Sequence, residues 1–125
     1  MKIKSVRLVT LLAALFLGSG GISPAAEPSK EDAALTLKLM TATEKLDYEA
    51  FVSDSVRPIT KEQFEAVATK LAPRLQAGHE LSYLGVLTQR GQRVTVWKLS
   101  FKDGSDDHLV TLGVKDGKVG SFLIR

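Results

Sequence analysis

The chain has 125 residues, no cysteine and a formal net charge of +3, from 17 Lys and Arg against 14 Asp and Glu. This length fits a single domain, and the lack of cysteine excludes disulfides, lipoprotein acylation and thiolate metal sites. All three excess cations fall within the first 25 residues, so the rest of the chain is formally neutral and lacks the basic face that nucleic-acid binding requires.

The start of the chain has the pattern of a secretory signal peptide. A basic first segment leads into an apolar run (8–17), and small residues follow it (18–26) with a suitable cleavage point after Ala25. A membrane-spanning helix needs about 20 apolar residues, about twice the length of this run. We therefore predict a signal peptide at 1–25 and a single domain at 26–125. The protein would be periplasmic or secreted, without membrane attachment after cleavage.

Two amphipathic helices are predicted at the start of the domain. The first begins at Ser29, in a sequence that resembles a capping box, and its apolar residues recur at helical spacing as far as Tyr48. The second begins at Thr60, where Thr-Lys-Glu-Gln forms a complete capping box, and it ends at Gly78. A connection (49–59) with a short apolar anchor at Phe51-Val52 joins the two helices.

From His79 onward the apolar residues alternate, as they do in β-strands. Dipeptides that end in glycine mark three hairpin turns, at 90–91, 103–104 and 116–117. The predicted strands are 80–89, 93–101, 107–114 and 118–124. The predicted fold class is therefore α+β, with two N-terminal helices packed on a four-stranded antiparallel sheet.

Two-residue loops at all three turns would fix which side chains share a sheet face. The helix-facing side would then contain Leu84, Val86, Trp97, Leu99, Phe101, Val110, Leu112, Val114, Val119 and Leu123. The opposite side would contain Leu81, Tyr83, Leu87, Val94, Val96, Leu109, Phe122 and Ile124. A solvated sheet face is normally polar, so this second apolar face predicts a homodimer or another protein partner. A register shift of one residue would exchange the two faces, and a chain terminus folded over the outer face is the alternative.

Few residues could perform catalysis. In the predicted register His108 and Tyr48 could line one cavity with Ser82 and Trp97, with His108 as the base and Tyr48 as a hydrogen-bond donor. No hydrolase elbow or phosphate-binding loop occurs in the sequence. His79 and His108 do not have the spacing of metal ligands relative to the dispersed carboxylates. We therefore expect no metal and no cofactor.

Several segments resemble a set of small secreted bacterial domains of unknown function. They are 47–51 (Asp-Tyr-Glu-Ala-Phe), 60–64 (Thr-Lys-Glu-Gln-Phe), 71–75 (Leu-Ala-Pro-Arg-Leu) and 115–119 (Lys-Asp-Gly-Lys-Val). These domains are similar to the nuclear transport factor 2-like (cystatin-like) superfamily, in which helices pack into the concave side of a curved sheet. The resemblance implies that roll over residues 30–125. The superfamily includes isomerases, dehydratases, binding subunits and dimerisation modules, so the resemblance does not imply one activity.

The sequence favours an exported, non-enzymatic domain that binds a protein partner or a small apolar ligand, most simply as a homodimer. The alternative is a small lyase or isomerase that uses His108 and Tyr48 in a cone-shaped pocket. An inhibitory hairpin of the cystatin type is disfavoured, because the segment 92–96 matches only the Gln and first Val of Gln-x-Val-x-Gly and ends in Val96.

Overall fold

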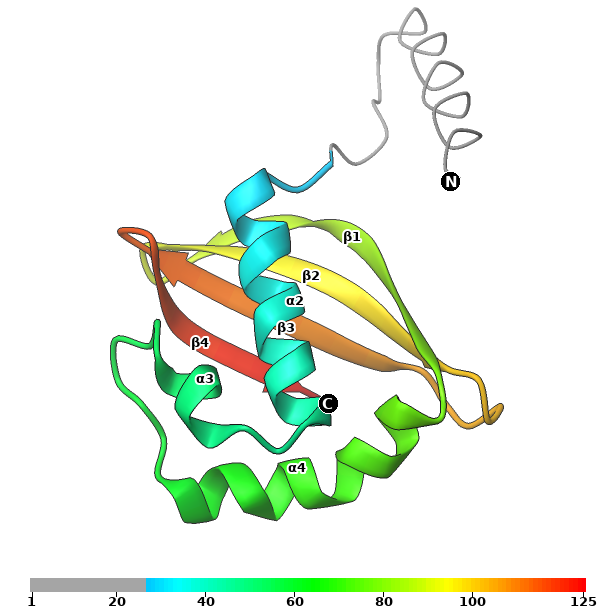
Figure 1. The fold of residues 1–125 in the computed structure, drawn as a ribbon. Coiled ribbons are helices and arrows are strands. Elements are labelled where there is room, and N and C mark those ends of the chain that lie inside the picture. Colours follow the sequence, from blue (N-terminus) through cyan, green and yellow to red (C-terminus); the bar gives the residue numbers. More distant parts are fainter. Residues whose placement is uncertain (1–26) are drawn as a thin grey trace, which may run out of the picture.

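A computed structural model describes residues 27–125, and the predicted signal peptide lies outside this range. The helices are α2 (Lys30–Glu44), α3 (Tyr48–Val52) and α4 (Lys61–Gln76), and the strands are β1 (His79–Gln89), β2 (Gln92–Phe101), β3 (His108–Lys115) and β4 (Lys118–Ile124). The strands form one antiparallel sheet in the order β1-β2-β3-β4. The helices lie on one side of this twisted sheet (Figure 1). The predicted α+β class with four antiparallel strands is confirmed.

Both long helices begin where the sequence predicts. The Ser29 side chain accepts a hydrogen bond from the amide of Asp32 at 3.1 Å, which caps α2. Thr60 and Gln63 exchange side chain to backbone hydrogen bonds of 3.1 and 3.0 Å, which is the complete capping box of α4. These contacts satisfy amides that have no partner inside the first helical turn.

The first helix is shorter than predicted, and a third helix follows it. α2 ends at Glu44, and Leu46 adopts a left-handed backbone conformation (φ 56°) that reverses the chain. Asp47 then caps α3, its side chain accepting from the amide of Ala50 at 3.1 Å. The prediction of a helix to Tyr48 was wrong because Leu46 continues the apolar spacing although its side chain is 47% exposed.

The tight turns form as predicted at two of the three hairpins. Gln89 pairs with Gln92 and Lys115 pairs with Lys118 across two-residue loops whose residues all have positive φ. This geometry suits the right-handed twist of the adjoining strands. The middle connection is longer (102–107), but the predicted pairing of Leu99 with His108 is present.

A bulge in β1 changes the predicted register. The pairing shifts between Tyr83 and Gly85, so Leu84 is an extra residue and Tyr83 lies opposite Trp97. Because side chains alternate along a strand, one extra residue exchanges the faces on either side of it. Leu81 and Tyr83 therefore face the helices, contrary to the prediction.

A second bulge has the same effect in β4. Gly113 pairs with Ser121 and Val114 with Val119, so Gly120 is the extra residue. Ile124, and not Leu123, consequently lies opposite Val110.

The bulges correct the composition of both sheet faces. Four of the eight residues predicted for the outer face pack against the helix-side core instead: Leu81, Tyr83, Phe122 and Ile124. The residues Leu87, Val94, Val96 and Leu109 do lie on the outer face, joined there by Leu123. Three residues predicted to be buried are about half exposed, namely Leu84, Val86 and Leu123.

The core fills the space between the helices and the inner sheet face. One cluster joins Met40 of α2 and Leu75 of α4 to Trp97, Leu99 and Val110 of the central strands. A smaller cluster joins Leu39 to Leu112, Val114 and Val119. No helix within residues 27–125 is long and apolar enough to cross a membrane.

Candidate functional site

Tyr48 is held by a structural hydrogen bond. Its hydroxyl donates to the backbone carbonyl of Ile59 at 2.6 Å, and its ring packs on Phe64 with the centroids 5.8 Å apart. The hydroxyl proton of Tyr48, which a catalytic donor would offer to a substrate, is therefore already donated to a backbone carbonyl.

His108 lies at the other end of the helical layer. Its ring packs edge-on against the Phe101 ring, with the centroids 5.6 Å apart. The Cζ atom of Arg74 lies over the same Phe101 ring, 3.9 Å from its centroid. Tyr48 contacts Phe64 of α4, whereas His108 lies near Arg74 of the same helix. Phe64 and Arg74 are ten residues apart, which corresponds to about 15 Å along a helix. The structure does not bring His108 and Tyr48 into one cavity.

The other two predicted pocket residues are also separated. Ser82 pairs with Lys98 on the outer sheet face, because the bulge at Leu84 reverses the predicted alternation. Trp97 is buried in the core, where its indole N–H donates to the Thr95 hydroxyl at 3.0 Å. The cone-shaped pocket predicted from Tyr48, Ser82, Trp97 and His108 does not form.

Two further features of the described residues concern metal ligands and buried polar atoms. Residues 27–125 contain no group of three or more His, Asp or Glu side chains that could hold a metal ion. All buried side-chain polar atoms in this range have hydrogen-bond partners. His79 lies at the junction of α4 and β1, with Nδ1 3.0 Å from the carbonyl oxygen of Leu75.

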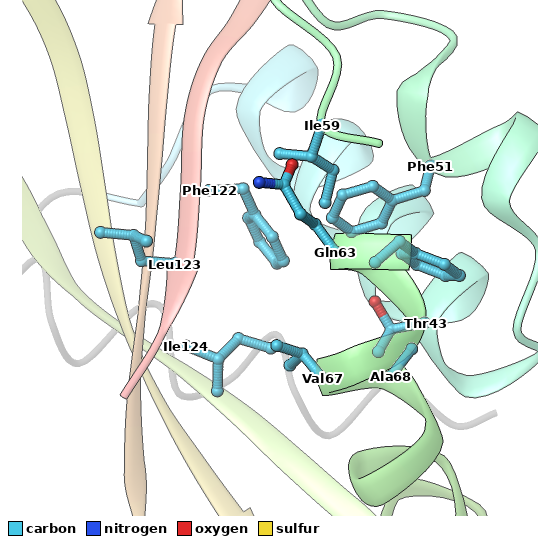
Figure 2. Close-up of a pocket in the computed structure, with 10 residues that line it drawn as sticks. Thr43, Phe51, Ile59, Gln63, Val67, Ala68, Phe122, Leu123 and Ile124 are labelled. Carbon is cyan, nitrogen blue, oxygen red and sulfur yellow. The ribbon is translucent and has the colours of Figure 1, made fainter. Parts of the chain in front are cut away.

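An apolar groove runs along the edge of β4 instead. Its two compartments have volumes of about 140 and 230 Å³, and both are lined by Phe51, Ile59, Phe122 and Leu123. Figure 2 shows the first compartment, where Phe122 and Ile124 point from β4 towards Val67 and Ala68 of α4, whereas Leu123 points to the other side of the strand. We refer to the two compartments together as the β4 groove.

Aromatic packing builds the floor of the β4 groove. The Phe51 ring of α3 lies 4.8 Å from Phe64 of α4 and 5.8 Å from Phe122 of β4, centroid to centroid. One ring from the short helix thus joins α4 to the last strand. Such edge and tilted contacts are favourable arrangements for aromatic side chains.

The segment after α3 forms the wall of the second compartment. The amide of Val119 donates to the carbonyl of Asp54 at 2.8 Å, and the amide of Val56 donates to the carbonyl of Val119 at 2.9 Å. These bonds pair the segment in parallel with the first residues of β4. Lys38 of α2 also holds this segment, because its Nζ forms an ion pair with Oδ2 of Asp54 at 2.8 Å.

The rest of the β4 edge is unpaired. Leu109 and Arg125 exchange two backbone hydrogen bonds of 2.8 and 2.9 Å, so the backbone groups of Arg125 point towards β3. Because this direction alternates along an antiparallel strand, the N–H and C=O of Phe122 and Ile124 point away from the sheet. Within residues 27–125 no other group forms a hydrogen bond with them.

Three basic residues lie in or beside the segments that form the β4 groove. Arg57 lines the second compartment, and Lys118 and Arg125 stand at the two ends of β4. All three side chains are exposed, and none forms an ion pair with another described residue.

The sequence did not predict the β4 groove. The residues that wall it, from Phe51 to Ile59, are predicted from the sequence only as a connection. The available signal was the presence of large apolar side chains in an otherwise polar loop, which indicates that the loop packs on something.

Comparison with known proteins gives no family. No family model matches the chain, and no curated protein matches it in sequence. One solved structure that it is similar to is the crystal structure of AclR, a proposed hydroxylase from Streptomyces galilaeus. The two share 14% identity over 76% of this chain and 79% of that chain, with a TM-score of 0.41. At this level of similarity the comparison supports neither a shared fold nor a shared activity.

Proposed function

We propose that this protein is an exported, non-enzymatic binding domain, and that the β4 groove binds a segment of another protein. The observation that carries the proposal is the size of the apolar compartments, about 140 and 230 Å³. Pockets for small-molecule ligands usually measure ~300–1,000 Å³, whereas a cavity of ~150 Å³ holds a benzene ring. Each compartment by itself therefore fits about one large apolar side chain, and the two together reach only the lower end of the range for small-molecule pockets.

Other observations support the same proposal. The hydroxyl of Tyr48 is bonded to the protein itself, and His108 lies at the far end of α4. The leader-like sequence of residues 1–25 supports export. Helices on one side of a twisted four-stranded sheet support the cystatin-like roll as the finer description of the fold.

A random heptapeptide library displayed on phage tests the proposed site. Val67→Glu would place a charge at the groove, where burial of an unpaired charge is costly. Val86→Glu is the matched control, because the two valines are 53% and 51% exposed and Val86 lies outside the groove. We expect peptides that bind the wild-type chain and Val86→Glu but lose at least ~10-fold in affinity for Val67→Glu.

Two results would contradict the proposal. One is a selection that enriches no peptide, or only peptides that bind Val67→Glu equally well. The other is a small molecule retained in the groove when the purified chain is examined by native mass spectrometry.

We also propose that the outer sheet face joins two copies of the chain. Leu87, Leu109 and Leu123 are 43–49% exposed on that face, and the helices cover only the other side. Exposed apolar clusters of this kind commonly mark protein contacts. The two proposed surfaces meet at Leu123, which belongs to the outer sheet face and also lines both compartments of the groove.

A further inference from the structure

We propose that the β4 groove recognises its partner by β-strand addition, a mode that rests on the binding function proposed above. The partner is an extended segment of a different polypeptide that pairs with the free edge of β4. It carries apolar side chains at alternate positions and an acidic residue that meets Arg57.

The backbone of β4 supplies the first part of the argument. Phe122 and Ile124 present two N–H donors and two C=O acceptors in one row, all directed away from β3. Such a row is the template to which an added strand hydrogen-bonds. The segment at Asp54 to Val56 already uses this edge in the same way at Val119, so the edge is compatible with a further strand.

The side chains of the β4 groove supply the second part. An added strand places every second side chain on the helix-facing side, next to Phe122 and Ile124. Successive side chains on that face are about 7 Å apart along the strand. The two compartments lie consecutively along β4 and share Phe122 between them, so each can receive one of these side chains.

Charge decides between a second copy and a different partner. β4 begins with Lys118, is followed by Arg125 and contains no acidic residue, and Arg57 lines the second compartment of the groove. If a second copy paired through its own β4, the basic side chains of the two copies would lie near one another and repel. A segment with Asp or Glu beside its apolar residues would instead complement this edge.

Amide hydrogen exchange on the chain with a selected peptide tests the pairing mode. In the free chain the amides of Phe122 and Ile124 should exchange fast, whereas those of Ser121 and Leu123, which point towards β3, should be protected. Bound peptide should slow exchange at Phe122 and Ile124 by at least ~10-fold and leave Ser121 and Leu123 as internal controls. The selected sequences should alternate apolar residues, and Arg57→Gln should weaken binding about two- to fivefold, whereas Lys98→Gln should not.

The outcomes separate the two proposals. If the peptide shifts the methyl signals of Val67 and Ile124 but does not slow exchange at Phe122 and Ile124, strand addition is wrong and the groove still binds. If no peptide is selected, the binding function itself is overturned. Concentration-dependent protection of the same amides in the chain alone would show that a second copy is the occupant, which would also overturn this inference.

Discussion

The carboxylate of Asp32, on the first turn of α2, forms a bidentate ion pair with the guanidinium of Arg93 at the start of β2. Arg93 donates from Nε to Oδ2 at 2.9 Å and from Nη2 to Oδ1 at 2.8 Å. The Asp32 side chain is 2% exposed, whereas that of Arg93 is 51% exposed. This two-point contact ties the helical layer to the sheet.

Loss of the guanidinium should therefore destabilise the fold. We expect Arg93→Gln to lower the free energy of unfolding by about 1–3 kcal/mol, because the buried carboxylate would lose two charge-assisted hydrogen bonds. Urea denaturation measures the change. Lys98→Gln, an exposed site on the same strand without an ion pair among the described residues, is the control and should change stability little.

The same contact predicts an acid-sensitive stability. The hydrogen bonds from Arg93 hold the pKa of Asp32 below its ordinary value, against the opposing effect of burial. The unfolded chain thus binds this proton at a higher pH than the folded chain does, so the contribution is present above about pH 4 and is lost as the pH falls through the folded pKa. Below pH 4 the free energy of unfolding should fall less steeply with decreasing pH in Asp32→Asn, because the variant lacks this carboxyl group. The difference in slope should correspond to the uptake of at most one proton on unfolding. An unchanged slope in urea titrations from pH 5 to pH 2 would show that Asp32 does not contribute.

The β1 bulge gives a third prediction. Deletion of Leu84 should bring Tyr83 next to Gly85 in a regular ladder, with Tyr83 still opposite Trp97 and Leu81 still opposite Leu99, so both side chains keep facing the helices and little stability should be lost. Deletion of Ser82 should instead move either Leu81 or Tyr83 to the outer face, with a loss of about 1.5 kcal/mol or more, since each buried apolar side chain contributes ~1.5–3 kcal/mol. Thermal unfolding of the two variants makes the comparison, and equal losses would mean that the register is not set by this bulge.

The capping box of α4 gives a fourth. Thr60→Ala should destabilise the chain by about 1 kcal/mol, because the amide of Gln63 would lose its acceptor. The same change at Thr69, an exposed position inside α4, serves as the control and should be neutral or slightly stabilising, since alanine favours the helix. Urea denaturation of both variants distinguishes a cap effect from a general effect on the helix.

The proposed dimer can be tested at the outer sheet face. Sedimentation of the wild-type chain at high micromolar concentration should give the mass of a dimer. Leu109→Glu should shift this equilibrium towards the monomer, because a charge would replace a leucine of the proposed contact. A wild-type chain that stays monomeric under these conditions would contradict the proposed dimer.

The sequence predicted the parts of the fold that depend on local rules. Ser29 and Thr60 mark the helix starts because their side chains satisfy neighbouring amides. The glycine-containing turns at 90–91 and 116–117 require a backbone with positive φ, and both occur where expected. Such features are determined by a few adjacent residues, so a pattern is sufficient to find them.

The sequence failed where the outcome depends on contacts across the chain. A glycine within a strand often accompanies a bulge, as Gly85 and Gly120 do here, but it does not fix which residue is extra, and each bulge reverses the faces of its strand. The predicted pocket around Ser82 and His108 depended on that alternation and was lost with it. The β4 groove was missed for a related reason, since Phe51 meets Phe122 only after the whole chain has folded.

The unpaired backbone of β4 also affects how the protein behaves when no partner is present. An unpaired strand edge next to apolar side chains is the kind of surface on which ordered β-aggregates grow. Lys118 and Arg125 stand at its two ends, where charged residues commonly act as gatekeepers against this process. Neutralising both could therefore cost solubility during production of the protein even if the folded state were unaltered.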